Sequence, residues 1–255
     1  MTIDGDKQAG PRDCVELPKP TGFEGTDVWV FDLDNTLYPA ESNLFLQMDV
    51  KMQEFIAKYL GVPLLYARHL QKNYYRQFGT TLAGLMKVHR MPPHAFLEYV
   101  HDLDLSSVPE HPELAEVIAR LPGRKLIFTA GSRRHAENVA GKLGVLDHFE
   151  DIMDIVDTSF VPKERAEAFD ALLMRHAIEP GKAAMFEDMP HNLVPPHDLG
   201  MTTVLVYSAR VDHPVARRIR AWSEPPPHIH HMTQNLCNFL ERVADDHATS
   251  QAPDN

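Results

Sequence analysis

The chain has 255 residues, 44% of them hydrophobic, which is enough for one large core or two smaller ones. Its formal net charge of −11 argues against a nucleic-acid polymer or an anionic membrane surface as the main partner, because such binding depends on clustered Lys and Arg. Cys14 and Cys237 are the only cysteines, one near each end, so we expect no disulfide framework.

Both ends of the chain are polar. Residues 1–21 are rich in Gly, Asp, Lys and Pro, and residues 244–255 are similar, so we predict that neither segment has a fixed structure. The first twenty residues lack the apolar region of a signal peptide, and no run of about eighteen apolar residues occurs. We therefore expect a cytoplasmic location and no membrane partner.

Short apolar runs alternate with longer helical patterns through the rest of the chain. We predict strands at residues 28–32, 125–130, 152–157, 183–188 and 202–208. This alternation is typical of βαβ units and favours an α/β fold with a parallel sheet. Four of the runs end in a polar residue, namely Asp32, Asp157, Asp188 and Ser208. Because ligands of open α/β sheets bind beyond the carboxyl ends of the strands, we expect the chemistry at that edge.

Residues 38–112 show no strand-like alternation and indicate a helical insertion after the first strand. Apolar residues recur at helical spacing from Leu44 to Tyr59, residues 64–78 suit a second helix, and Pro92 and Pro93 can open a third. Near the other end, Pro225 to Pro227 interrupt the chain before a last amphipathic helix at residues 235–243.

The first strand delivers two carboxylates into a turn. Asp32 and Asp34 are two residues apart, and on an extended backbone such residues point the same way, so both can share one pocket. A structural strand with a solvated tip is the alternative for this segment alone. Asp-Leu-Asp-Asn-Thr-Leu after an apolar strand resembles the first motif of the haloacid dehalogenase-like (HAD) hydrolases. The resemblance implies that Asp32 is a nucleophile and that Asp34 is a general acid and base.

Two further segments resemble the phosphate-handling motifs of the same family. Residues 126–132 read as a strand that ends in Thr129, Ala130 and a glycine, and the hydroxyl and nearby backbone N–H groups can bind a phosphoryl oxygen. Lys163 occupies the position of the lysine that neutralises the nucleophile and the phosphoryl charge. Glu164 stands where the family usually has Pro, so we expect a different start of the following helix.

The last motif is acidic. Residues 183–193 resemble the family segment in which an Asp corresponding to Asp188 binds magnesium and a residue four positions later, here Asn192, supports the site. Pro195 and Pro196 replace a region that is commonly helical in the family, so we expect that helix to be distorted or displaced. Glu187 should point to the opposite face of an extended strand, behind the site.

The four motifs follow the family's order, with the helical insertion between the first and the second. The resemblance implies a member of subfamily I, with a Rossmann-like α/β core at residues 22–37 and 113–243 and a helical cap at 38–112. A phosphate monoester beside Asp32, Asp34 and Asp188 is repulsive by roughly several kcal/mol without a cation. We therefore expect Mg²⁺, held by the carboxylates of Asp32 and Asp188 and, as in the family, the backbone carbonyl of Asp34.

The cap narrows the expected substrate. Tyr38 and Pro39 and residues 73–75, 78–85 and 96–101 look like the cap of the pyrimidine 5′-nucleotidase branch, which implies nucleoside monophosphates such as UMP and CMP as substrates. Cap aromatics can stack on a base, and Thr80, Thr81 or His89 can bond its polar edge; the alternative is that these residues only pack the cap.

Two other functions stay open at this point. One is a HAD phosphatase of a sugar phosphate, phosphoglycolate or another small metabolite, and the other is a non-catalytic regulatory protein on the same scaffold. The oligomeric state is open as well. His228, His230 and His231 suggest a metal site at first, but no acid or Cys joins them at a convincing spacing, and we predict a surface loop there.

Overall fold

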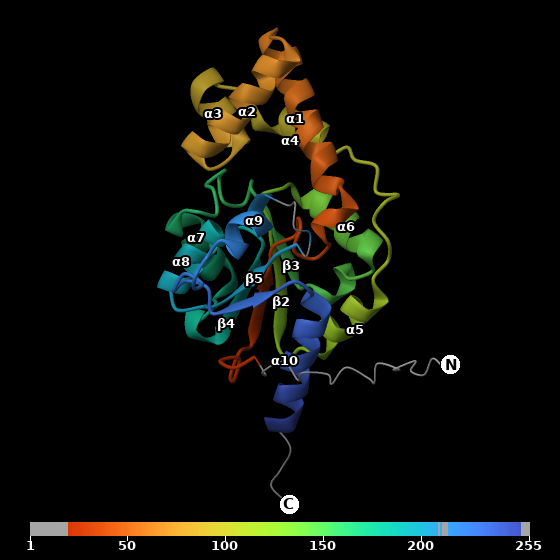
Figure 1. Ribbon diagram of the computed structural model, residues 1–255, viewed down its shortest axis with the longest axis vertical. Coiled ribbons are helices and arrows are strands. Elements are labelled where there is room, and N and C mark those ends of the chain that lie inside the picture. Colours follow the sequence, from red (N-terminus) through yellow and green to blue (C-terminus); the bar gives the residue numbers. More distant parts are fainter. Residues whose placement is uncertain (1–19, 209, 211–213, 251–255) are drawn as a thin grey trace, which may run out of the picture.

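The computed structural model describes residues 20–208, 210 and 214–250. Within these residues, six parallel strands form one sheet in the order β3-β2-β1-β4-β5-β6 (Figure 1). The strands are β1 (Val28–Phe31), β2 (Arg124–Phe128), β3 (Asp151–Met153), β4 (Ala183–Glu187), β5 (Thr202–Val206) and β6 (His231–Thr233). The predicted α/β fold with a parallel sheet is confirmed.

The register of the central strands sets where the motifs meet. Phe31, the last residue of β1, lies opposite Ile127 of β2 and Phe186 of β4. These three strands therefore end at nearly the same level. The residues that follow them, which include the two carboxylates of the first motif, Thr129 and Asp188, meet at one edge of the sheet.

Helices cover both faces of the sheet. Trp29 and Phe31 share one core with α5 (Pro112–Arg120), α6 (Arg133–Leu143) and α10 (Leu236–Ser250). Val28 and Val30 point the other way, into a core formed with α7 (Ala166–His176) and α9 (Pro214–Arg220). Because both faces are covered, β1 is apolar at every position rather than alternating. No helix in the described part of the chain has the length and apolar character that crossing a bilayer requires.

The chain between β1 and α5 forms a layer of four helices beyond the carboxyl edge of the sheet (Figure 1). They are α1 (Leu44–Leu60), α2 (Leu64–Phe78), α3 (Thr81–His89) and α4 (Pro93–Val100). Residues of all four helices pack into a core of their own, which includes Met48, Tyr74, Leu85 and Phe96. The bounds of α2 agree with the prediction, whereas α3 was not predicted.

The predicted strands were too long at their carboxyl ends. The run predicted to end at Asp157 stops as a strand at Met153, and the run predicted to end at Ser208 stops at Val206. A turn begins two residues after Met153, and beyond Val206 only the backbone N–H of Tyr207 still bonds the neighbouring strand, at Thr233 O and 2.9 Å. Asp32 also lies one residue beyond β1, although its backbone N–H still donates to Phe186 O at 2.9 Å.

Two elements near the C-terminus differ from the prediction. The predicted surface loop at His228 to His231 is wrong for His231, which begins β6, a strand too short to show alternation. The last helix continues past Val243 to Ser250, because its apolar side extends to Ala244 and Arg120 pairs with Asp245, so residues 244–250 do not lack structure. Residues 1–19 and 251–255, predicted to be unstructured, lie outside the described residues.

The helix expected to be distorted by Pro195 and Pro196 forms as one short turn, α8 (Val194–Asp198), directly after the 3₁₀ helix η4 (Pro190–Leu193). Both prolines fall in the first turn of α8. The backbone N–H groups of a first turn have no partner within the helix, so proline is tolerated there.

Gly84 allows α3 to lie against α2. A Cβ at this position would overlap Cβ of Tyr74 and come within 2.9 Å of Cδ2 of Phe78. We expect Gly84→Ala to lower the free energy of unfolding by about 1–3 kcal/mol through overpacking. Urea unfolding measures this effect. Gly181→Ala is the matched control, because a Cβ there meets nothing within 4 Å, and an equal loss in both variants would contradict the packing role of Gly84.

Candidate active site

Asp32 is held in a fixed orientation directly after β1. Its side chain is buried, its Oδ1 accepts a hydrogen bond from Nζ of Lys163 at 2.5 Å, and its Oδ2 accepts one from Oγ1 of Thr36 at 3.2 Å. The carboxylate therefore lies at the edge of the sheet where the sequence placed the nucleophile.

Lys163 is buried in the segment before α7 and joins three elements. Besides Asp32, its Nζ contacts Oε2 of Glu187 at 2.6 Å and the carbonyl oxygen of Phe128 at 3.2 Å. Burial lowers the pKa of the ammonium group, but the charges of Asp32 and Glu187 outweigh burial and raise that pKa above its ordinary value. Lys163 is thus a permanent cation between two carboxylates. Glu164, in place of the usual Pro, is followed by a helix that begins at Ala166.

Glu187 was expected behind the site, and the structure places it inside. It is the last residue of β4, is only 1% exposed, and binds both Lys163 and the backbone N–H of Met189, the latter at 3.2 Å. Burial raises its pKa, but Lys163 outweighs burial and leaves the pKa below its ordinary value. The argument from strand alternation failed because Asp188 lies just outside β4, where the backbone turns.

Asp32, Glu187 and Asp188 form a cluster of three acids whose oxygen atoms lie within 4.8 Å of one another. Burial and the charge of Glu187 raise the pKa of Asp32 to about 7, although Lys163 opposes the shift. The same two causes raise the pKa of Asp188 well above its ordinary value. One ammonium group therefore does not neutralise this pocket. An all-oxygen donor set with excess negative charge fits a hard divalent cation such as Mg²⁺.

Asp34 lies in the turn after Asp32 and has different partners. Its Oδ1 accepts hydrogen bonds from the hydroxyl of Tyr38 at 2.5 Å and from Nε2 of His135 at 2.8 Å. Burial raises the pKa of Asp34, but His135 and then Tyr38 outweigh it and lower that pKa below the ordinary value. Sequence reasoning did not find His135, because a histidine inside α6 gives no local sign that it contacts this turn.

Asn35 is a further residue that the sequence analysis missed. Its backbone is left-handed, with φ of 61°, and its Nδ2 donates to Oδ2 of Asp188 at 3.3 Å. The turn after β1 thereby contacts Asp188, which directly follows β4.

The loop after β2 carries the predicted phosphate-binding residues. Thr129 is buried, its backbone N–H donates to Met153 O at 3.0 Å, and its Oγ1 accepts from the N–H of Gly131 at 2.9 Å. The N–H of Gly131 is therefore engaged within the loop, and the binding of phosphate by Thr129 and Ala130 stays a prediction. Ala130 is exposed between Thr129 and Gly131, and the hydroxyl proton of Thr129 remains available to an oxygen ligand.

Two residues singled out from the sequence have other surroundings. Asn192 lies in η4, where its backbone N–H donates to Met189 O at 3.0 Å; among the described residues its side chain makes no hydrogen bond, and its supporting role stays a prediction. Asp157 pairs with Arg175 at 2.6 Å and Arg133 at 3.4 Å, which stabilises the loop after β3 and keeps Asp157 away from the acids.

Residues 26–193 match the family model of the haloacid dehalogenase-like hydrolases, and they contain every candidate residue described above. The chain belongs to this family.

Similar proteins agree with this assignment. The curated Phosphate metabolism protein 8 of Saccharomyces cerevisiae is 26% identical over 212 residues, which are 76% of this chain and 64% of that protein. This HAD-like chain therefore spans less than two thirds of that relative. Among solved structures, a HAD phosphatase from Thermococcus onnurineus has a TM-score of 0.56 at 16% identity, covering 86% of this chain and 97% of its own.

Two other solved structures share the fold, and their names describe a hydrolase and a dehalogenase. The putative HAD-hydrolase YfnB from Bacillus subtilis, described as bound to magnesium, has a TM-score of 0.52 at 13% identity and covers 87% of this chain and 98% of its own. The L-2-haloacid dehalogenase from Xanthobacter autotrophicus has a TM-score of 0.51 at 15% identity and covers 86% and 98%. At these identities the likeness shows the fold alone.

The cap of this HAD-like chain uses its predicted base-binding residues internally. Thr80 caps α3 by accepting from Ala83 N at 3.0 Å, Thr81 donates to Gln71 O at 3.3 Å, and His89 bonds the hydroxyl of Tyr74 at 2.7 Å. Tyr75 of α2 differs from them. It is 39% exposed, and burial followed by the charges of Asp188 and Glu187 raises its pKa to about 12.

Two of the three histidines before α10, His230 and His231, have structural partners. His230 bonds Oγ1 of Thr203 through Nδ1 at 3.0 Å, and Nε2 of His231 lies 2.8 Å from Thr21 O. Within the described residues only Asp32, Glu187 and Asp188 form a cluster of three or more groups suited to a metal ion, and no histidine belongs to it.

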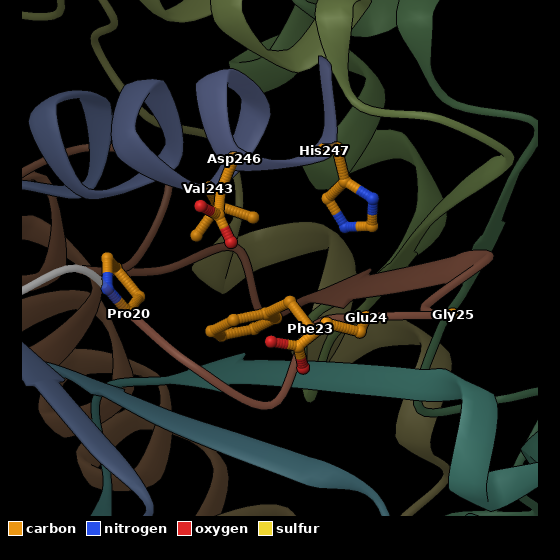
Figure 2. Close-up of a pocket in the computed structure, with 7 residues that line it drawn as sticks. All are labelled: Pro20, Phe23, Glu24, Gly25, Val243, Asp246 and His247. Atoms are coloured by element: carbon orange, nitrogen blue, oxygen red, sulfur yellow. The ribbon is translucent and has the colours of Figure 1, made fainter. Parts of the chain in front are cut away.

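A cavity of about 150 Å³ lies between residues 20–25 and the end of α10 (Figure 2). Phe23, Val243 and His247 line it. Because residues 20–25 precede β1, this cavity lies at the amino edge of the sheet, opposite the catalytic candidates. It holds none of the predicted site residues.

Proposed function

We propose that this HAD-like hydrolase is a magnesium-dependent phosphatase of small phosphomonoesters that works through an aspartyl-phosphate on Asp32. One observation carries the proposal: the turn after β1 holds two carboxylates in different surroundings. Asp32 contacts the ammonium group of Lys163, whereas Asp34 is bonded to Tyr38 and His135. Such a pair supplies one group for bond formation and another for proton transfer.

In the first half of the reaction, an oxygen of Asp32 attacks phosphorus and the bond to the ester oxygen breaks. Substrate must bind the form in which Asp34 is protonated, against the lowered pKa that His135 and Tyr38 give it, and Asp34 then passes that proton to the departing alkoxide. In the second half, Asp34 takes a proton from water, which attacks phosphorus and releases Asp32 and inorganic phosphate. Thr129 and Lys163 bind phosphoryl oxygens and oppose their charge.

Magnesium fits the charge of this pocket. Asp32 and Asp188 would hold the ion, with Glu187 as the third acid of the cluster. When bound, Mg²⁺ supplies positive charge that offsets the repulsion between substrate phosphate and carboxylates. The magnesium in the structure of YfnB, which shares the fold, supports this choice.

Asp34 favours a phosphatase over a dehalogenase. A halide leaves without a proton, whereas an alkoxide needs one, so a second carboxylate held by Tyr38 and His135 is useful only to the phosphatase. The similarity to a protein named for phosphate metabolism supports the same reading.

Within this class, we propose a pyrimidine 5′-nucleotidase that converts UMP or CMP to nucleoside and phosphate. The resemblance of the cap segments to that branch is the main support. Tyr75, which is 39% exposed and whose pKa is raised by burial and then by the charges of Asp188 and Glu187, offers a ring and a hydroxyl to a substrate base.

The test is inorganic phosphate release from UMP, CMP, AMP, GMP and several sugar phosphates, with Mg²⁺ and with EDTA. We expect release to require Mg²⁺ and kcat/KM for UMP and CMP to exceed that for sugar phosphates by at least about tenfold, roughly 1.4 kcal/mol. Equal rates on all esters would remove the nucleotidase assignment, and activity unaffected by EDTA would remove the metal. No release from any ester would favour a regulatory protein.

A further inference from the structure

The acid-base candidate is anchored through one oxygen. Both hydrogen bonds to Asp34, from Tyr38 and from His135, end on Oδ1. In the described part of the chain, no hydrogen bond reaches Oδ2. The anchored oxygen fixes the plane of the carboxylate, and the other oxygen is free to meet a leaving group.

The orientation of His135 depends on a second histidine. The ring of His101 stacks on that of His135 with a centroid distance of 4.5 Å and an interplanar angle of 13°. A Cβ on Gly131 would come within 3.1 Å of Cδ2 of His135 and 3.4 Å of Nε2 of His101. The two rings thus fill the space beside Gly131, and His135 has little room to tilt.

His101 belongs to the cap, whereas His135 and Asp34 belong to the core. It ends α4, and its Nδ1 lies 3.0 Å from Oγ of Ser132, the residue that caps α6. Burial and then the neighbouring His135 lower the pKa of His101 to about 3, so its ring is neutral near neutral pH. A neutral ring stacks on His135 without adding a repulsive charge.

We propose that His101 is a positioning residue through which the cap aligns the acid: by stacking on His135 it keeps Nε2 of His135 directed at Asp34. The inference rests on the proposed function, in which Asp34 protonates the leaving oxygen. Proton transfer by Asp34 then depends on how α4 packs against α6.

The experiment compares an aryl phosphate, p-nitrophenyl phosphate, with an alkyl phosphate of similar size, using kcat/KM, which reports the steps through loss of the alcohol. A nitrophenolate leaves without much help from an acid, whereas an alkoxide needs the proton. We expect His101→Ala to lower kcat/KM at least about tenfold on the alkyl ester and less than about threefold on the aryl ester. His101→Phe, which keeps a flat ring, should recover most of the loss.

His69→Ala is the matched control, because His69 is an exposed histidine of the same cap, on α2. It should match the wild type on both esters. Equal losses on the two esters in His101→Ala, or no recovery in His101→Phe when its thermal midpoint equals that of the wild type, would overturn the positioning role alone. A wild type that cleaves neither ester would instead overturn the proposed function and this inference with it.

Discussion

Asp32→Asn should lower phosphate release by at least about 10⁴-fold and leave the fold intact. Asparagine has nearly the same shape, but its amide does not attack phosphorus, so no aspartyl-phosphate forms. The fold should tolerate the change because burial and Glu187 already disfavour the charge of Asp32, raising its pKa to about 7. The measurement is steady-state phosphate release on the best ester, with urea unfolding to verify stability.

Asp34→Asn is the comparison that separates the two carboxylates. It removes proton transfer but keeps the nucleophile, so the loss should be smaller, about 10²–10³-fold, and concentrated on esters with poor leaving groups. Rapid acid quench with radiolabelled substrate should trap labelled protein in the wild type and none in Asp32→Asn. Substantial turnover or labelling in Asp32→Asn would mean that another residue is the nucleophile.

The sequence predicted those parts of the site that depend on local pattern. Asp32, Asp188 and Lys163 each follow an apolar run or precede a helix, and the parallel topology brings such ends to one edge of the sheet. The structure places Lys163 against Asp32 and places Asp188 in the same acidic cluster. The fold class and the family were predictable for the same reason.

The partners of these residues were not predictable, because they depend on contacts between distant segments. His135 reaches Asp34 only when α6 packs beside the turn after β1, and His101 reaches His135 only when α4 meets α6. Glu187 was misplaced by assuming that β4 continues through Asp188. A pattern of two-residue alternation holds only while the strand does, and sequence does not fix the residue at which pairing stops.

Lys163→Met should destabilise the protein by about 3–5 kcal/mol at neutral pH in the presence of a chelator. Methionine retains the length of the side chain but leaves Asp32 and Glu187 buried without the cation that both contact, at 2.5 and 2.6 Å. Phosphate release should fall as well, because the phosphoryl charge loses its counter-ion. Urea unfolding in EDTA gives the stability difference without compensation by added metal.

The pH dependence of this difference follows from Glu187. Lys163 holds the pKa of Glu187 below the ordinary value of 4.5, despite burial. The ionised form of Glu187 therefore stabilises the wild type at pH values above 4.5, the ordinary pKa. This contribution is lost as the pH falls through the lower pKa that Glu187 has in the folded protein. In Lys163→Met, only the hydrogen bonds of Asp188 and of the Met189 N–H still oppose burial, so the pKa of Glu187 rises above its wild-type value and the variant loses more stability than the wild type as the pH rises. The gap between the two proteins should be largest near neutral pH and shrink toward about pH 4.5.

Lys182→Met is the matched control. Lys182 forms an exposed pair with Glu179 at 2.6 Å, which solvent screens, so its loss should change stability little at any pH in the same range. If Lys163→Met were as stable as Lys182→Met at neutral pH in EDTA, the charge of Lys163 would not be what offsets Asp32 and Glu187. A stability difference of several kcal/mol between wild type and Lys163→Met that closes on acidification would link folding to the proposed reaction. The ammonium group of Lys163 would then have two roles: it offsets the buried carboxylates before substrate binds, and it offsets the phosphoryl charge afterwards.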